Sequence, residues 1–236
     1  MIKKILMFVF LLLPALAQAG FMLEPYLGHI ATGDASANET TSNTIKFSNS
    51  YSGTTVGGRV GFSYKYLLFG GGYSMARFDM RYDATSDNGN SESYHDQYLA
   101  QYKSIFTGLI LSSAFRLIGS YYQEVTLEDR DPVLMQNGSE VLGGPEGATQ
   151  TGDKFYGRGY GALISYTGFK SLGFNLEYRK LIMRKFKDKR NENFGDITTT
   201  TFLGDGAVFT KYSTTELVIT LSFPFEILTW KEGPRP

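Results

Sequence analysis

The chain contains no cysteine, a single tryptophan and only two histidines in 236 residues. Without cysteine it can form neither a disulfide framework nor a thiolate metal site, so burial and backbone pairing must hold the fold together. Its 23 basic and 23 acidic residues cancel, which excludes an overall basic field for binding nucleic acid. Beyond the N-terminal leader no run of about 18 apolar residues occurs, which excludes a membrane protein built from helices.

A secretory leader is the clearest feature of the N-terminus. Lys3 and Lys4 precede an apolar run over residues 5–13, and the small-residue motif Ala17-Gln18-Ala19 follows. The run is too short for a retained membrane anchor. We therefore expect residues 1–19 to be a signal peptide and residues 20–236 to be an exported domain with a short C-terminal tail.

Alternation of apolar and polar residues predicts an all-β domain. The 27 glycines, 16 tyrosines and 18 phenylalanines favour strands and tight turns over helices. Eight strands are expected, at 21–31, 54–64, 67–82, 101–115, 117–128, 154–167, 171–185 and 211–227.

The expected connections alternate between long and short. Long polar stretches cover 32–53, 83–100, 129–153 and 187–210, whereas the links at 65–66, at Arg116 and at 168–170 are short. Outer-membrane barrels show this asymmetry, and strands of about ten residues suit a tilted crossing of the hydrocarbon. The sequence therefore predicts an eight-stranded antiparallel up-and-down transmembrane β-barrel. The alternative fold is a soluble secreted β-barrel.

Several segments carry a resemblance to a known family. They are Leu23–Gly28, Val56–Tyr64, Leu67–Tyr73 and the aromatic-rich last strand, which together resemble the small bacterial outer-membrane β-barrel domain family of the OmpA and OmpX types. The resemblance implies an outer-membrane location, contact with outer-membrane lipids including lipopolysaccharide, and insertion by the barrel assembly machinery. That machinery reads a terminal strand of alternating apolar residues, which here are Leu217, Ile219, Leu221, Phe223 and Phe225. Eleven residues follow Phe225, whereas the family's terminal aromatic is usually last.

Charged residues on the inner faces of the strands predict an ion-pair network. An eight-stranded barrel has room inside for side chains or for one small ligand, and unpaired charge there is costly. We expect Arg59 to contact Glu24 or Glu177, which closes the lumen; the alternative is a narrow path for solutes or protons. The residues expected in this network are Glu24, Arg59, Glu124, Glu177 and Arg179.

A basic run begins where the seventh expected strand leaves the outer leaflet. Lipopolysaccharide presents phosphates there, and Arg and Lys side chains suit phosphate. The run predicts a lipopolysaccharide contact, with a solvated charge run as the alternative. Its residues are Arg184, Lys185, Lys187, Lys189 and Arg190.

Catalytic and metal-binding signals are weak. Ser91, Ser93, His95 and Asp96 combine a nucleophile, a base and an orienting acid, but they fall in an expected polar loop. The acidic loop around them lacks calcium-loop spacing, and the glycine clusters lack the context of phosphate loops. We therefore expect no cofactor, no metal and no nucleic-acid partner, and a non-enzymatic envelope-structural or surface-interaction role through long extracellular loops. The alternatives are a narrow conduit or binding barrel for small or hydrophobic solutes, and a lipid-modifying hydrolase.

Overall fold

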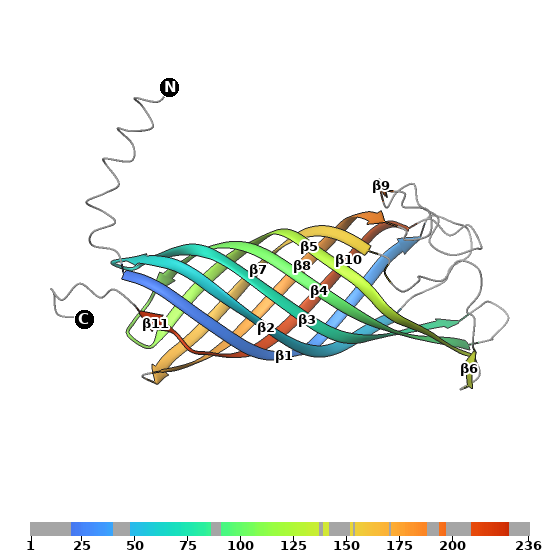
Figure 1. Ribbon diagram of the computed structural model, residues 1–236, viewed down its shortest axis with the longest axis horizontal. Helices are drawn as coiled ribbons and strands as arrows, with labels where there is room; N and C mark the ends of the chain where they lie inside the picture. The colour runs from blue at the N-terminus through green and yellow to red at the C-terminus, as the bar shows by residue number, and fades with distance from the viewer. Residues whose placement is uncertain are drawn as a thin grey trace, which may run out of the picture.

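The chain folds into a closed antiparallel barrel of eight long strands, as the sequence predicts (Figure 1). Each long strand pairs with its neighbours in the chain, and β10 closes the sheet by pairing with both β8 and β1. The long strands are β1 (Gly20–Glu39), β2 (Ser48–Tyr64), β3 (Leu67–Thr85), β4 (Ser91–Ile110), β5 (Phe115–Gln136), β7 (Lys154–Phe169), β8 (Leu172–Lys187) and β10 (Phe209–Ser222). Short additions are β6 (Ser139–Val141), β9 (Phe194–Asp196) and β11 (Phe225–Glu226).

The computed structural model describes the barrel and its short turns. The described residues are 20–39, 48–85, 91–136, 139–141, 152, 154–169, 171–187, 194–196 and 209–226. The expected signal peptide at 1–19 and the end of the C-terminal tail lie outside them. The short turns share one end of the barrel with the start of β1 and with β11, while β6 and β9 lie at the other (Figure 1). The end with the short turns is the periplasmic end of such a barrel.

Several strands extend far beyond their expected limits. β3 ends at Thr85 and β4 begins at Ser91, so most of the loop expected at 83–100 is strand, and β1, β2 and β5 likewise enter expected loops. These segments remain strands because polar and apolar residues still alternate there, but the polar residues now face outward and the apolar residues face the lumen. In the expected loop at 32–53, Ser50 and Ser52 are exposed on the outside, whereas Tyr51 between them is buried inside. The strands therefore rise out of the membrane as a sheet that is polar outside and packed within.

The turn expected at Arg116 lies elsewhere. It occupies residues 111–114, where the Ser112 hydroxyl accepts hydrogen bonds from the backbone N–H of Ala114 at 3.2 Å and of Phe115 at 3.1 Å. This local hydrogen bonding of serine with the backbone favours a turn over a continued strand. Arg116 consequently belongs to β5, and its side chain is buried inside the barrel.

An apolar belt surrounds the outside of the barrel. Every long strand presents exposed apolar side chains near the periplasmic end, in alternation with buried ones. Examples, one from each long strand in order, are Leu27, Val60, Phe69, Ile105, Leu117, Ile164, Leu176 and Ile219. A closed barrel with such a belt is the architecture of bacterial outer-membrane proteins, and the protein is located there. Among the described residues there is no helix with the length and apolar character to cross a membrane.

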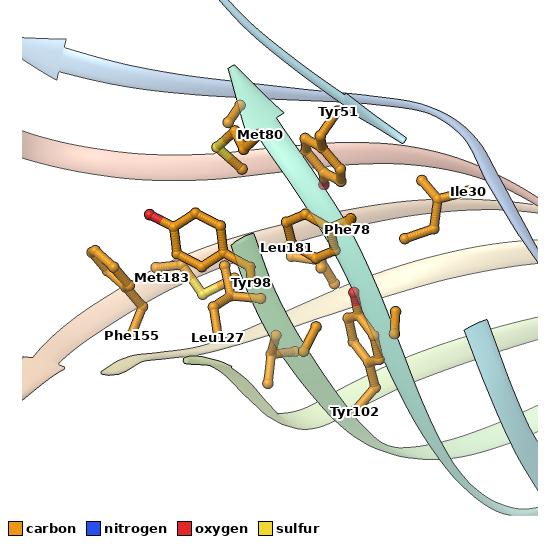
Figure 2. Packing of buried hydrophobic residues seen from close by; sticks show 14 of the residues in the cluster. Ile30, Tyr51, Phe78, Met80, Tyr98, Tyr102, Leu127, Phe155, Leu181 and Met183 are labelled. Carbon is orange, nitrogen blue, oxygen red and sulfur yellow. The ribbon is translucent and has the colours of Figure 1, made fainter. Parts of the chain in front are cut away.

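The lumen is filled by two apolar clusters. The smaller one lies toward the periplasmic end and consists of Met22, Leu68, Phe106, Ile118 and Leu163. The larger one fills the outer part, where the Phe78 ring stacks on Tyr51 at 4.4 Å and on Tyr98 at 5.8 Å between centroids (Figure 2). Leu181 and Met183 from β8 complete this packing. The interior therefore resembles the core of a soluble β-barrel more than a water-filled channel.

Candidate functional site

An ionic network crosses the lumen between the two apolar clusters. Arginine and glutamate alternate along it in the order Arg116, Glu24, Arg59, Glu177, Arg179 and Glu216. The successive nitrogen-to-oxygen distances are 3.7, 3.4, 3.5, 3.0 and 3.6 Å. At one end, Arg116 also lies 3.4 Å from the sulfur of Met22 in the smaller cluster. The network therefore links β5, β1, β2, β8 and β10 through their inner faces.

Tyrosine hydroxyls from other strands complete the network. Tyr51 and Tyr102 both donate to Oε1 of Glu216, at 2.9 and 3.0 Å, and the Tyr122 hydroxyl donates to Oε1 of Glu177. Tyr51 and Tyr102 also belong to the larger apolar cluster, so they connect the ionic network to that cluster.

Aromatic rings also cover the arginines of the network. The Arg59 guanidinium lies 4.5 Å from the centroid of the Tyr26 ring, and that of Arg179 lies 5.0 Å from Tyr102 and 5.5 Å from Tyr122. Desolvated cation–π contacts of this kind add to the ion pairing.

The network is buried and its charges balance. Arg179 and Glu216 have 0% of their surface exposed and Glu24 has 1%. An unpaired charge in such a place is strongly unfavourable, whereas three arginines alternating with three glutamates leave each charge beside an opposite one. The arrangement suits a lumen that is held closed.

A glycine on β1 makes the hydrogen bond between Tyr51 and Glu216 possible. A Cβ at Gly33 on β1 would collide with the ring of Tyr51 on β2. The absent side chain lets that ring lie across β1 and bring its hydroxyl to Glu216. Glycine in a strand commonly marks such a close approach.

Glu124 does not belong to the network, and its predicted inward position is wrong. The register of β5 shifts after Tyr122, and pairing with β7 resumes where Val125 lies opposite Gly157. As a result the consecutive residues Gln123 and Glu124 both face outward. Glu124 pairs there with Lys103 at 2.9 Å, and the two side chains are 54% and 56% exposed. A β-bulge of this kind re-aims a side chain and disrupts simple alternation.

Arg116 and Glu216 are members of the network that the sequence prediction missed. A usable signal existed for both, because Phe115 and Leu117 flank Arg116, and Leu217 follows Glu216. Placing those apolar neighbours on the lipid face puts the charged residue inside.

The predicted assembly-signal strand is interrupted near its end. Leu217, Ile219 and Leu221 lie on the outer face of β10, which ends at Ser222. Pro224 then breaks the ladder, since proline has no N–H to donate, and Phe225 belongs to the separate β11, which pairs with Leu23. The exposed Phe223 and Phe225 still continue the apolar surface.

The predicted lipopolysaccharide residues are only partly described. Arg184, Lys185 and Lys187 lie on the outer wall of β8, while Lys189 and Arg190 lie outside the described residues. Ser91, Ser93, His95 and Asp96, which were expected in a polar loop and not as catalytic residues, belong to β4. In the part of the chain that the structure describes, no group of three or more His, Cys, Asp or Glu side chains is placed to hold a metal ion.

Known outer-membrane proteins share the general architecture of this chain at low sequence identity. The outer-membrane protein OprG from Pseudomonas aeruginosa is 12% identical, with 89% of this chain and 97% of that chain covered and a TM-score of 0.49. Ail of Yersinia pestis, in complex with the heparin analogue sucrose octasulfate, is 9% identical, with 88% and 98% covered and a TM-score of 0.45. The outer-membrane protease OmpT from Escherichia coli is 10% identical, with 88% and 96% covered and a TM-score of 0.35. No protein-family model and no curated protein sequence matches the chain.

Proposed function

We propose that the protein is a closed, non-enzymatic outer-membrane barrel with an envelope-structural and surface-interaction role. The observation that carries this proposal is the filled lumen, in which a charge-balanced network lies between two apolar clusters. A conduit for solutes needs a continuous polar gap along the axis. At the level of Arg179 and Leu181, both 0% exposed, side chains fill the lumen instead.

Conductance tests this proposal directly. Purified barrel reconstituted into planar bilayers or liposomes is expected to give neither steady conductance nor swelling in sugar solutions, with a general porin as the positive control for insertion. Reconstitution is checked by heat-modifiable gel mobility. Steady, large conductance from folded barrel would overturn the closed-lumen proposal.

The surface role rests on the sheet that rises above the apolar belt. Its outer face carries polar residues such as Asp79 and Ser52, while Phe78 and Tyr51 pack inside, so the outer loops stand on a rigid base. An epitope tag inserted within residues 86–90 is expected to be accessible to antibody on intact cells. Labelling that requires permeabilised cells would contradict this orientation.

The absence of catalysis is tested separately. Reconstituted protein is expected not to hydrolyse phospholipid, lipopolysaccharide acyl chains or peptide. Turnover by the wild-type protein that is lost in His29→Ala or His95→Ala, with folding intact, would replace the non-enzymatic proposal by a hydrolase.

A further inference from the structure

A polar arc lines the lumen near its periplasmic end, on the inner faces of β7, β8 and β10. Ser165 on β7 lies in register with Asn175 on β8, and Asn175 lies in register with Thr220 on β10. Two residues nearer the short turns, Gly173 lies opposite Ser222. These five inward-facing residues form the polar arc, and none of them carries a large apolar side chain.

Three oxygen atoms of the polar arc are buried without a hydrogen-bond partner among the described residues. They are Oγ of Ser165, Oδ1 of Asn175 and Oγ of Ser222, on residues that are at most 2% exposed. The amide nitrogen of Asn175 donates to the Thr220 hydroxyl at 3.0 Å, so the amide is held in place while its oxygen remains unpaired. Buried polar atoms are hydrogen-bonded in folded proteins, and ordered water is the usual partner where protein groups supply none.

A carboxylate oxygen of the ionic network adjoins the polar arc. Glu24 lies on β1 two residues from Tyr26, which is in register with Ser222, so Glu24 is a diagonal neighbour of Ser222. Its Oε2 atom lies 3.7 Å from Nη1 of Arg116, too far for a hydrogen bond, and has no such partner elsewhere in the described chain. Arg116 is in register with Ser165 on the other side. The polar arc therefore runs between the two members of this ion pair.

Two features keep side-chain volume away from the polar arc. Gly173 has no side chain, and a Cβ there would collide with the Ser222 hydroxyl. Phe106, the aromatic member of the smaller apolar cluster, lies against Gly70 on β3, where an added Cβ would collide with its ring. β3 stands across the barrel from β8, since four steps separate them in either direction around the sheet. The ring is therefore turned away from the polar arc, whose own side chains are short.

We infer that the polar arc and Oε2 of Glu24 bind a cluster of ordered water molecules that exchanges with the periplasm. A water molecule can donate to Oδ1 of Asn175 and to the carboxylate, and it can serve either serine hydroxyl as donor or acceptor. A metal cation fits less well, because the guanidinium groups of Arg59 and Arg116 lie 3.4 and 3.7 Å from the same carboxylate.

Water enters this site from the periplasmic end. Arg116 follows the turn at 111–114 and keeps 9% of its surface exposed. Toward the outside the larger apolar cluster fills the lumen, so the site is hydrated from one end only. The inference goes beyond the closed-lumen proposal and does not depend on it, because it concerns the periplasmic end alone.

Buried methionines at two heights report where the lumen is wet. Met22 lies 3.4 Å from Arg116, whereas Met80 belongs to the larger apolar cluster, and both are at most 2% exposed. X-ray irradiation of the full barrel in phospholipid vesicles produces hydroxyl radicals from water in place, and mass spectrometry measures the oxidation rate of each methionine. The filled variant Ser165→Val/Asn175→Leu is compared with Ser50→Val/Ser52→Val, which makes similar changes on the outside of β2. Heat-modifiable mobility confirms that each variant is folded.

Met22 in the wild type is expected to oxidise about tenfold faster than Met80, because radicals form in the water beside it. The filled variant should lower the Met22 rate by about threefold or more, whereas the control variant should leave it unchanged. Equal rates for Met22 and Met80 in the wild type, or an unchanged Met22 rate in the filled variant, would overturn the inference. Exchange of sodium chloride for choline chloride at equal ionic strength should have no effect, and a sodium-dependent rate would overturn it in favour of a bound cation.

A second variant keeps the test open if the filled variant does not fold. Ser165→Ala/Ser222→Ala removes two hydroxyls without adding volume. If those hydroxyls bind water, their loss should lower the equilibrium constant for folding by about fivefold or more. A raised equilibrium constant would mean that the hydroxyls are buried dry, which contradicts the inference.

Discussion

The guanidinium of Arg179 and the carboxylate of Glu216 lie 3.6 Å apart, and neither side chain has any exposed surface. Replacing Glu216 by leucine leaves Arg179 with Glu177 as its remaining acid and leaves two tyrosine hydroxyls without their acceptor. We expect this change to lower the free energy of unfolding by about 3–5 kcal/mol. Urea titration of the barrel in phospholipid vesicles measures the change.

The double variant Arg179→Met/Glu216→Leu provides the cross-check for this pair. It removes both buried charges, so it should be less destabilised than Glu216→Leu alone. Asp34→Asn, at an exposed site on β1, should alter stability by less than about 0.5 kcal/mol. If the double variant were less stable than the single one, Arg179 would be adequately compensated without Glu216.

Glu124 should contribute little to stability, because it forms an exposed ion pair. Glu124→Gln is expected to lower the free energy of unfolding by about 1 kcal/mol or less. Glu177→Gln, in which the replaced carboxylate is 2% exposed and contacts two arginines, should cost several times more. The same vesicle titration ranks the two variants, and similar losses would show that Glu124 also acts inside the barrel.

The lipid-facing side of β10 is tested by inserting a charge. Ile219 is 50% exposed within the apolar belt, so Ile219→Arg should lower the free energy of unfolding by about 2–4 kcal/mol. Thr54→Arg, on the outer face of β2 beyond the apolar Val56, should cost about 0–1 kcal/mol. Equal costs in a folding titration would mean that the belt does not end below Thr54.

The outer apolar cluster is expected to stabilise the part of the barrel above the membrane. Phe78 is 1% exposed and stacks on two tyrosines, so Phe78→Ala should cost about 3–5 kcal/mol through the lost contacts and the cavity. Ser52→Ala, at an exposed position beside Tyr51 in sequence, serves as the control and should be near neutral. A small effect of Phe78→Ala would indicate that this part of the lumen is loosely packed.

The barrel could be predicted from the sequence because, along each strand, every second residue faces the lipid and the residues between them face the lumen. Wherever lipid-facing and lumen-facing residues alternate cleanly, as around Arg59 and Glu177, the faces follow from the order of the residues. The strand ends were mispredicted because polar side chains were interpreted as loop. Above the belt the outer face is polar because it meets water, and the buried inner residues Tyr51 and Tyr98 carried the strand signal instead.

The misplaced Glu124 has a different cause. Alternation predicts a face only while the register is unbroken, and the bulge after Tyr122 is an extra residue that no hydrophobic pattern marks. The partners within the network were also beyond sequence reasoning, apart from the expected contact of Arg59 with Glu24 or Glu177. Arg179 and Glu216 approach each other because β8 and β10 pair, whereas Arg59 meets Glu177 across the lumen from a strand that does not adjoin β8.

The order in which the strands enter the network bears on how the barrel is completed. Glu216 is contributed by β10, which must pair with β1 from the other end of the chain to close the sheet. Before that step the network contains three arginines but only two glutamates, Glu24 and Glu177, so Arg179 has only one of its two acidic partners. Docking of the last strand thus gives Arg179 its second carboxylate in the same step that closes the barrel wall.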